Sequence, residues 1–373
     1  MYSALGERGN DTFATMRHGR LGSAAKPLRL DTFRGGRPGD SPSGSRLPLT
    51  TRLTSSWLGS TLSTDHPCRS VTGPLRSGRS TLQGCPVPDP QLAAFERAIA
   101  DRWVIDGEIG RGSRATTYRA RDGANGGAVA IKVFRSDLTS AIDERQFLKQ
   151  MRKTADIRHE NIVPVLEVNN AAGRLFLVMP FIEGESLRSR LRREGRLPLS
   201  EAVGIARQVA DALAVVHAND ALHKDVKPEK IFLTGSRALL MDFGVSRAIT
   251  RSIAATMTGS GITLGTPVYM SPEHARGGVE IDARADLFSL GCVLYEMLAG
   301  EPPFTGANAV TILKKMVSET PVPITTIRDS VPVEVDVALD HLLAKAPAAR
   351  YPDAAHLVDA LSALESRLPT ERV

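Results

Sequence analysis

The 373-residue chain is 42% apolar and 24% charged, which is ordinary for a protein with a sizeable core. No stretch approaches the roughly 18 to 20 uninterrupted apolar residues that a membrane helix needs, so we expect no membrane span. The first residues also lack the apolar core of a secretory signal. The three cysteines show no C-x-x-C spacing and no paired framework, which favours a reducing, cytoplasmic setting.

The formal charge of +6 raises the question of a nucleic-acid partner. Residues 1–90 hold twelve Lys or Arg and six Asp or Glu, whereas the rest of the chain holds 35 of each. The excess therefore lies wholly in the first 90 residues. Because this segment lacks interleaved aromatics and a dense run of charge, a nucleic-acid role is not favoured.

Residues 1–90 are rich in Gly, Ser, Thr, Arg and Pro and show no sustained hydrophobic period. Such a segment cannot bury enough apolar surface to offset its ordering entropy, so we expect a disordered tail. An organellar transit peptide has a similar composition, and a misassigned start codon is a further alternative. The tail reading is the one we favour.

Order is expected from residue 91 onward. Leu92, Phe95 and Ile99 fall at helical spacing, which predicts a short helical lead-in over residues 91–102. A second helix is expected where Phe147, Leu148, Met151 and Ala155 share one face. The predicted strands are Trp103–Ile109, Thr117–Arg121, Val129–Phe134, Val163–Val168 and Leu175–Met179.

The chain after Ser186 is mostly helical in pattern. Ser200 and Glu201 predict the start of one long helix, and Asp286–Ala299 is apolar nearly all round, which indicates a helix buried within a large lobe. Strands first and helices afterwards predict an α+β fold with a small sheet lobe and a larger helical lobe.

Two short motifs in the predicted sheet have a chemical reading. Gly110-Arg-Gly112 lies between two strands, where glycines let backbone amides approach phosphate oxygens, although two glycines in a hairpin usually mean only a tight turn. Lys132 stands inside an apolar strand. A buried lysine is unfavourable unless it is paired, so we expect an anionic partner.

The segment His223-Lys-Asp225-Val-Lys227-Pro-Glu-Lys230 is the most informative. Asp225 is placed to accept a hydroxyl proton while Lys227 neutralises a transferring phosphate. A solvated polar loop is the alternative, but Met241-Asp242-Phe243-Gly244 follows after a strand pattern and argues against it. Asp242 ends an apolar run and suits a magnesium ion as a hard oxygen ligand.

These pieces, in this order and spacing, resemble the bacterial eukaryotic-like serine/threonine protein kinase family. The likeness covers residues 103 to about 364, and residues 365–373 read as a C-terminal tail. It implies a two-lobed protein-kinase fold, with a small antiparallel-sheet N-lobe, one main helix there, and a larger helical C-lobe. Further matching segments are Gly265-Thr266-Pro, Ser271-Pro272-Glu273, Asp286-Leu-Phe-Ser-Leu-Gly291 and Arg350-Tyr-Pro.

The resemblance implies ATP and Mg2+ as cofactors. Lys132 would hold the α- and β-phosphates, Asp225 would be the catalytic base, and Lys227 would contact the γ-phosphate. Asp242 would bind magnesium, and Asp286 and the pair Glu273–Arg350 would be scaffold residues. The remaining nucleotide contacts would come from Ile109, Gly110, Gly112, Thr117 and Ala130 and from the hinge residues Met179, Pro180 and Ile182.

The resemblance also implies a protein substrate with a Ser or Thr acceptor. Gly265-Thr266 and Lys227 two places after Asp225 are typical of the serine/threonine subclass. Autophosphorylation is expected at Thr256 or Thr258, with a homodimer as one way to achieve it and Lys224 receiving the charge. No membrane partner is expected.

Several residues depart from the family pattern. The third loop glycine is Ala115, and the helix glutamate expected to pair with Lys132 is Gln150. Lys230 stands in place of a magnesium-binding asparagine; an ammonium has no lone pair for a metal, but it can neutralise phosphate charge and so replace one cation. Lys224 replaces an arginine and loses its bidentate fork.

Two functions of different class follow. The first is an active kinase of full or reduced rate, which the retention of Lys132, Asp225 and Asp242 favours. The second is a pseudokinase, a nucleotide-binding or scaffold domain without significant phosphotransfer, which Gln150 and Lys230 favour. Small-molecule phosphotransferases share an Asp-centred loop, but Gly265-Thr266-Pro and Ser271-Pro-Glu273 fit protein substrates better.

Overall fold

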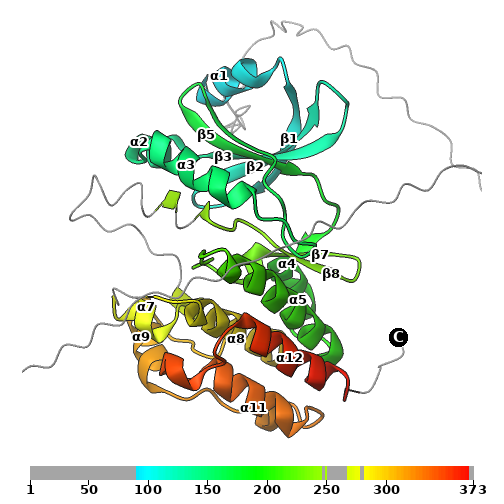
Figure 1. Cartoon of the computed structure of the whole chain (residues 1–373), viewed down its shortest axis with the longest axis vertical. Coiled ribbons are helices and arrows are strands. Elements are labelled where there is room, and N and C mark those ends of the chain that lie inside the picture. Colours follow the sequence, from blue (N-terminus) through cyan, green and yellow to red (C-terminus); the bar gives the residue numbers. More distant parts are fainter. Residues whose placement is uncertain (1–89, 246–247, 250–266, 278–280, 369–373) are drawn as a thin grey trace, which may run out of the picture. The chain divides into compact units, whose positions relative to one another are not determined.

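The computed structural model describes residues 90–245, 248–249, 267–277 and 281–368 (Figure 1). The predicted tail therefore lies outside the described residues, apart from residue 90. The same holds for Thr256 and Thr258, for Gly265-Thr266 and for the last five residues.

A five-stranded antiparallel sheet forms the first lobe, in the order β1-β2-β3-β5-β4. Buried and exposed residues alternate little along β3. Both of its faces are buried, because it is a central strand covered on each side. The strands are β1 (Trp103–Arg111), β2 (Ala115–Asp122), β3 (Ala128–Phe134), β4 (Glu167–Ala171) and β5 (Arg174–Pro180).

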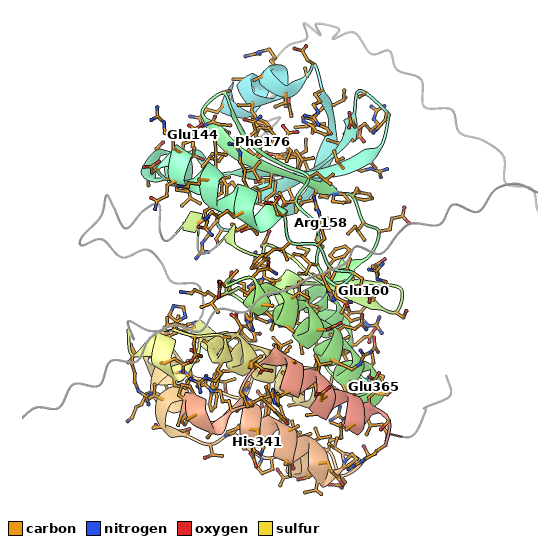
Figure 2. The ribbon with its side chains drawn as sticks, in the orientation of Figure 1. Glu144, Arg158, Glu160, Phe176, His341 and Glu365 are labelled. Carbon is orange, nitrogen blue, oxygen red and sulfur yellow. The ribbon has the colours of Figure 1, made fainter. Side chains whose placement is uncertain are left out.

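One face of this sheet is covered by α1 (Pro90–Ile99), the predicted lead-in helix. Phe95 and Ile99 are buried against Trp103, and the Phe95 ring meets the edge of the Phe176 ring with 5.3 Å between centroids (Figure 2 labels Phe176). The lead-in helix therefore contributes to the core of the sheet lobe.

We predict that deletion of residues 1–90 leaves the affinity for ATP unchanged, whereas deletion of residues 1–102 destabilises the sheet lobe. Removing the buried ring of Phe95 alone should lower the free energy of unfolding by about 3 kcal/mol. Nucleotide titration and thermal melting of the two truncated chains measure both effects. A large loss of affinity in the shorter deletion would show that the first 90 residues belong to the fold.

The other face is covered by α2 (Ser136–Ala141) and α3 (Glu144–Ala155) (Figure 1). α3 begins where the Asp143 side chain accepts a hydrogen bond from the Gln146 amide. Its buried residues Phe147 and Met151 pack with Phe134 on β3. This packing places α3 beside the strand that carries Lys132.

The predicted strand Val163–Val168 is wrong over its first four residues. Pro164 has no amide hydrogen for a ladder, and the Val163 amide donates instead to the carbonyl of Leu240, 3.0 Å away. The strand begins only at Glu167. It also ends later than expected, at a tight turn where Ala172 and Gly173 both have positive φ.

The second lobe is helical and has one large core that buries α8 on nearly every side. α5 begins one residue before the predicted cap: Pro198 is the N-cap, and Ser200 lies in the first turn. An ion pair of 2.6 Å between Arg207 and Glu365 joins α5 to α12 (Figure 2 labels Glu365). The helices are α4 (Leu187–Glu194), α5 (Leu199–Ala218), α7 (Pro272–Ala275), α8 (Arg284–Ala299), α9 (Ala309–Ser318), α10 (Ile324–Ile327), α11 (Val333–Leu342) and α12 (Ala354–Glu365), with short 3-10 turns η1 (Pro228–Lys230), η2 (Pro267–Tyr269) and η3 (Pro347–Ala349).

A second, three-stranded sheet lies on this lobe in the order β6-β7-β8. Its strands are β6 (Glu185–Ser186), β7 (Ile231–Thr234) and β8 (Arg237–Leu240). The predicted α+β arrangement, with a small antiparallel-sheet lobe and a larger helical lobe, is confirmed. Among the helices that the structure describes, none has the length and apolar character of a membrane span.

Candidate active site

The glycine-containing turn joins β1 to β2. Gly110 pairs with Thr117 across the hairpin, and the Gly112 amide donates to the Ala115 carbonyl at 2.9 Å. A Cβ on Gly110 would meet nothing within 4 Å, so the backbone faces open space here. Ala115, the departure at the third glycine position, is buried in the core between the sheet and α3. Its methyl group therefore points away from this open space.

Lys132, on β3, meets Asp242 across 110 residues of sequence. The distance from Lys132 Nζ to Asp242 Oδ2 is 2.5 Å, and the Lys230 ammonium pairs with the same oxygen. Asp242 is almost fully buried, with a side chain 3% exposed. The anionic partner predicted for Lys132 is therefore Asp242, and the sheet lobe and the helical lobe meet at this contact.

The pKa values of the three charged groups in this cluster are shifted in different directions. Burial would raise the pKa of Asp242, but the attraction of Lys132 and Lys230 outweighs it and holds that pKa well below its ordinary value. For Lys132, burial prevails and lowers the pKa. For Lys230, burial acts the same way, but the attraction of Asp242 and Asp225 is larger and raises its pKa. Asp242 is thus held as a carboxylate beside a firmly charged Lys230.

The second oxygen of Asp242 is a candidate metal ligand. Oδ1 is buried and has no hydrogen-bond partner among the described residues. A carboxylate oxygen with unshared lone pairs fits magnesium, which is usually held by one or two carboxylates together with substrate phosphates. Asp242 therefore fits the predicted role, while the ammonium of Lys230 offers a metal no lone pair.

Asp225 lies in the loop that precedes η1. Lys227 Nζ is 2.6 Å from Asp225 Oδ1, and both side chains are partly exposed. The Asp225 amide donates to His223 Nδ1, so the proton of that buried ring lies on Nε2, which meets the Met241 carbonyl at 3.0 Å. His223 thereby ties the Asp225 loop to the segment that carries Asp242.

Asp286, on α8, holds the same loop by accepting hydrogen bonds from its backbone. Its Oδ1 accepts from the Lys224 amide at 2.7 Å, and its Oδ2 accepts from the His223 amide and meets His217 Nε2, each at 2.9 Å. Lys224 and Asp242 both have φ near +60°, a region that residues other than glycine rarely adopt. The strained backbone next to Asp225 is therefore held by a buried carboxylate on α8.

Glu273 and Arg350 form the second predicted scaffold pair. Two parallel hydrogen bonds of 2.8 Å join the guanidinium to both oxygens of Glu273, and the Arg350 side chain is fully buried. A further, partly buried arginine, Arg188 on α4, pairs with Glu229 in η1 and Glu296 on α8. Arg188 therefore ties η1 to the helical core, whereas Arg350 ties α7 to the segment that precedes α12.

The protein kinase domain family matches residues 103–364. The chain belongs to the protein kinase family. The serine/threonine-protein kinase PknB of Mycobacterium leprae is 37% identical over 281 residues, which are 73% of this chain and 44% of that protein. PknA of Corynebacterium glutamicum is 36% identical over 273 residues, 70% of this chain and 55% of that protein.

Solved structures agree with this assignment. The PknI kinase domain of Mycobacterium tuberculosis superposes with a TM-score of 0.56 at 25% identity, covering 70% of this chain and 95% of that one. The relatives are bacterial serine/threonine kinases, as the sequence predicted. This chain spans less than half the length of the PknB relative that it matches.

Four residues that the sequence did not point to lie in an apolar cluster together with several predicted nucleotide residues. This small cluster lies where β3, the hinge, β7 and β8 meet, and Val163, Phe232, Leu239 and Met241 belong to it. Of the predicted nucleotide residues, Ala130, Met179 and Ile182 lie in the same cluster, whereas Ile109 is half exposed on β1. Phe232 was the available signal, because it is a large apolar residue on β7, the strand that directly follows Lys230.

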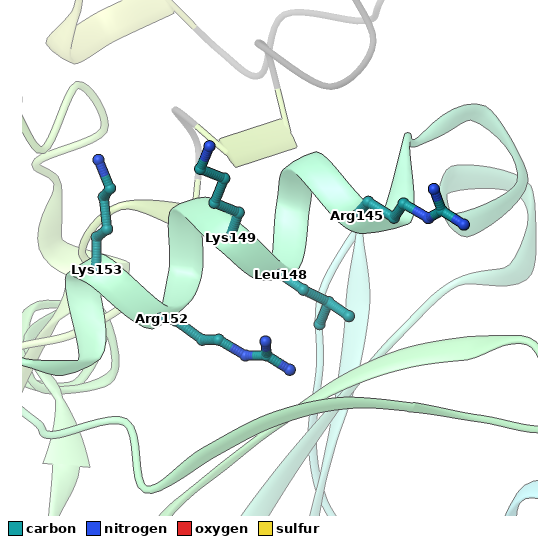
Figure 3. Close-up of a pocket in the computed structure, with 5 residues that line it drawn as sticks. All are labelled: Arg145, Leu148, Lys149, Arg152 and Lys153. Carbon is teal, nitrogen blue, oxygen red and sulfur yellow. The ribbon is translucent and has the colours of Figure 1, made fainter.

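Helix α3, which packs beside β3, carries no acidic partner for Lys132 among the described contacts. No hydrogen bond of the Gln150 side chain is present among the described residues, and Glu144 binds Asn170 instead. The outer face of α3 is basic: Figure 3 shows Arg145, Lys149, Arg152 and Lys153 with Leu148 around an open hollow of about 330 Å³. As expected from Gln150, α3 therefore provides no carboxylate for Lys132 in the folded chain.

Gly244 brings the segment after Asp242 into close contact with α3. It has a φ of +76°, and a Cβ there would strike the side chain of Thr154 on α3. Gly235, with a φ of +55° and nothing within 4 Å of an added Cβ, offers a matched site without the clash. We expect Gly235→Ala to lower the free energy of unfolding by about 1 kcal/mol through backbone strain alone.

We expect Gly244→Ala to lower the free energy of unfolding by about 2 to 4 kcal/mol, since steric displacement of α3 adds to the strain. Adding Thr154→Ala should recover the steric part. Denaturant unfolding of the two single variants and the double variant measures the difference. Equal effects of Gly235→Ala and Gly244→Ala would contradict a close packing of this glycine on α3.

Proposed function

We propose that this chain is a serine/threonine protein kinase that transfers the γ-phosphate of ATP to hydroxyl groups of proteins. The observation that carries the proposal is the convergence of Lys132 with Asp242, beside the loop that holds Asp225 and Lys227. Family membership and the names of the relatives support it. Because the chain spans less than half of the PknB relative, activity and substrate are proposed for this chain and not transferred as established.

ATP would bind between the two lobes. The glycine turn at Gly110 and Gly112 supplies backbone amides for the phosphates, and Lys132 holds the α- and β-phosphates. The adenine would lie on the apolar cluster of Ala130, Met179 and Phe232, with Ile109 and Thr117 above it and the hinge residues Pro180 and Ile182 at its edge. Pro180 has no amide hydrogen but keeps its carbonyl as an acceptor.

The transfer step uses Asp225 as the base. The substrate hydroxyl gives its proton to the Asp225 carboxylate as its oxygen forms a bond to the γ-phosphorus. The bond from that phosphorus to the β,γ-bridging oxygen breaks, and ADP leaves with the electron pair. Lys227 exchanges its pairing with Asp225 for the γ-phosphate and neutralises the charge that spreads over its oxygens. Magnesium, held by Asp242, would supply further charge neutralisation.

The protein substrate would carry a Ser or Thr acceptor, and the chain itself is one candidate. Autophosphorylation at Thr256 or Thr258, by one copy on another, is proposed with Lys224 as the residue that receives the charge. We propose a cytoplasmic location, where ATP and protein substrates are present.

A pseudokinase is the second candidate, and a specific observation favours it. Lys132 has no acidic partner on α3, and Lys230 occupies one oxygen of the metal ligand. In this case the site would bind nucleotide, or serve as a scaffold, without phosphotransfer.

The deciding experiment measures transfer of labelled phosphate from Mg-ATP to the protein itself or to a basic generic substrate. The full chain is compared with Asp225→Asn under identical conditions. Wild-type transfer no faster than that of the variant would reject the kinase proposal and leave the pseudokinase. Phosphopeptide mapping of the active protein then tests Thr256 and Thr258.

A further inference from the structure

Lys230 is fixed in place by its backbone as well as its side chain. Its amide donates to the Lys227 carbonyl, and its carbonyl accepts from the Met241 amide, each at 2.8 Å. These bonds link the end of the Asp225 loop to the residue before Asp242. The side chain is 19% exposed and reaches Asp242 Oδ2. The fold therefore holds this lysine at the site through both its backbone and its side chain.

The two oxygens of Asp242 therefore differ in what they can still bind. Oδ2 already accepts from Lys132 and Lys230, so two ammonium groups satisfy it. Oδ1 is buried without a partner among the described residues. Protein kinases generally place two magnesium ions at this position, one of them held by the asparagine that Lys230 replaces. Here one carboxylate oxygen remains for one ion.

We propose that Lys230 is a built-in cation of the nucleotide site, which replaces one of the two magnesium ions and lets the chain bind ATP with a single divalent ion. The inference rests on the proposed nucleotide binding. A tethered ammonium cannot dissociate or be removed by a chelator. It pairs with Asp242 and lies near enough to Asp225 to be stabilised by that charge, so it is placed to neutralise phosphate charge. Lys132 and Arg114, which is near enough to repel Lys230, add further positive charge there.

The first consequence is a weak dependence of ATP binding on divalent ions. Titration calorimetry with ATP, in excess Mg2+ and in EDTA, is run on the full-length wild type, Lys230→Asn and Lys149→Asn. Lys149 is an exposed lysine on α3 and controls for the loss of one charge. We expect EDTA to weaken ATP binding by less than about tenfold in wild type and in Lys149→Asn. In Lys230→Asn the loss should reach about tenfold to a hundredfold.

The second consequence concerns the number of bound metal ions. Electron paramagnetic resonance counts the Mn2+ ions bound at saturating ATP. We expect about one ion per protein in wild type and in Lys230→Met, and about two in Lys230→Asn, because only asparagine offers a carbonyl oxygen to a metal. Lys230→Met keeps the length of the side chain, and thermal melting confirms that each variant is folded.

The outcomes separate this inference from the proposed function. ATP binding by wild type with an EDTA penalty as large as that of Lys230→Asn, or with two Mn2+ ions, would overturn the single-ion site and leave the kinase proposal standing. Absence of ATP binding in both buffers would overturn the inference together with the proposed function. A small penalty and one ion in wild type, both changed in Lys230→Asn, would establish the built-in cation.

Discussion

Asp225→Asn is expected to slow phosphate transfer about 10²- to 10⁴-fold while leaving the affinity for ATP nearly unchanged. The amide keeps the shape of the carboxylate but cannot take the proton of the substrate hydroxyl. Asp225 pairs with Lys227 at the surface of the loop, where both side chains are partly exposed. Losing that pair should therefore alter the free energy of unfolding by less than about 1 kcal/mol.

The control for Asp225→Asn is the same change at Asp220, an exposed residue five positions earlier with a φ of +52°. Asparagine tolerates this backbone conformation well, so Asp220→Asn should keep the full transfer rate. Labelled phosphate is followed for wild type and both variants, together with ATP titrations. A parallel loss of ATP affinity in Asp225→Asn would show that the residue positions the nucleotide and is not the base.

Lys132, Asp225 and Asp242 could be singled out because each lies in a short segment whose pattern is local, and their proposed roles came from the resemblance to the kinase family. Lys132 is a charged residue in an apolar strand, and Asp225 and Asp242 lie on either side of a strand pair. The apolar cluster under the hinge could not be predicted in the same way. Val163 and Phe232 resemble ordinary core residues, and only the meeting of strands from both lobes brings them together.

The contact between Lys230 and Asp242 depends on the register of one hairpin. β7 and β8 pair Ile231 with Leu240, which sets the residues just outside the hairpin side by side. From sequence alone Lys230 was expected to face phosphate, and its carboxylate partner was not foreseen. The wrong strand at Val163–Val168 has a local cause, since the significance of Pro164 was overlooked. The contacts of residues that depart from the family pattern, such as Lys230, could therefore be interpreted only from the fold.

The buried carboxylate of Asp286 is also expected to affect transfer, but through position and not contact with substrate. In Asp286→Asn one carboxylate oxygen becomes an NH2 group, which must face either the Lys224 amide or the donors at Oδ2. A donor facing a donor in a site only 2% exposed should lower the free energy of unfolding by about 2 to 3 kcal/mol. Transfer should fall about 100-fold, because the loop shifts.

Asp282→Asn is the matched control, since Asp282 is half exposed and pairs with Arg284 at the surface. It should change the free energy of unfolding by less than about 0.5 kcal/mol. Denaturant unfolding and transfer rates of the folded proteins measure both effects. Undiminished transfer by Asp286→Asn would show that the loop keeps its geometry without the clamp.

The stability difference between wild type and Asp286→Asn should also depend on pH. Burial would raise the pKa of Asp286, but His217, His223 and the backbone amides outweigh it and lower that pKa. A carboxyl group whose pKa is lowered by folding stabilises the protein fully above its unfolded value of about 3.9, and that contribution fades as the pH falls further. The advantage of wild type should thus be constant near neutrality and shrink below about pH 4. An advantage independent of pH in this range would mean that the clamp acts without its charge.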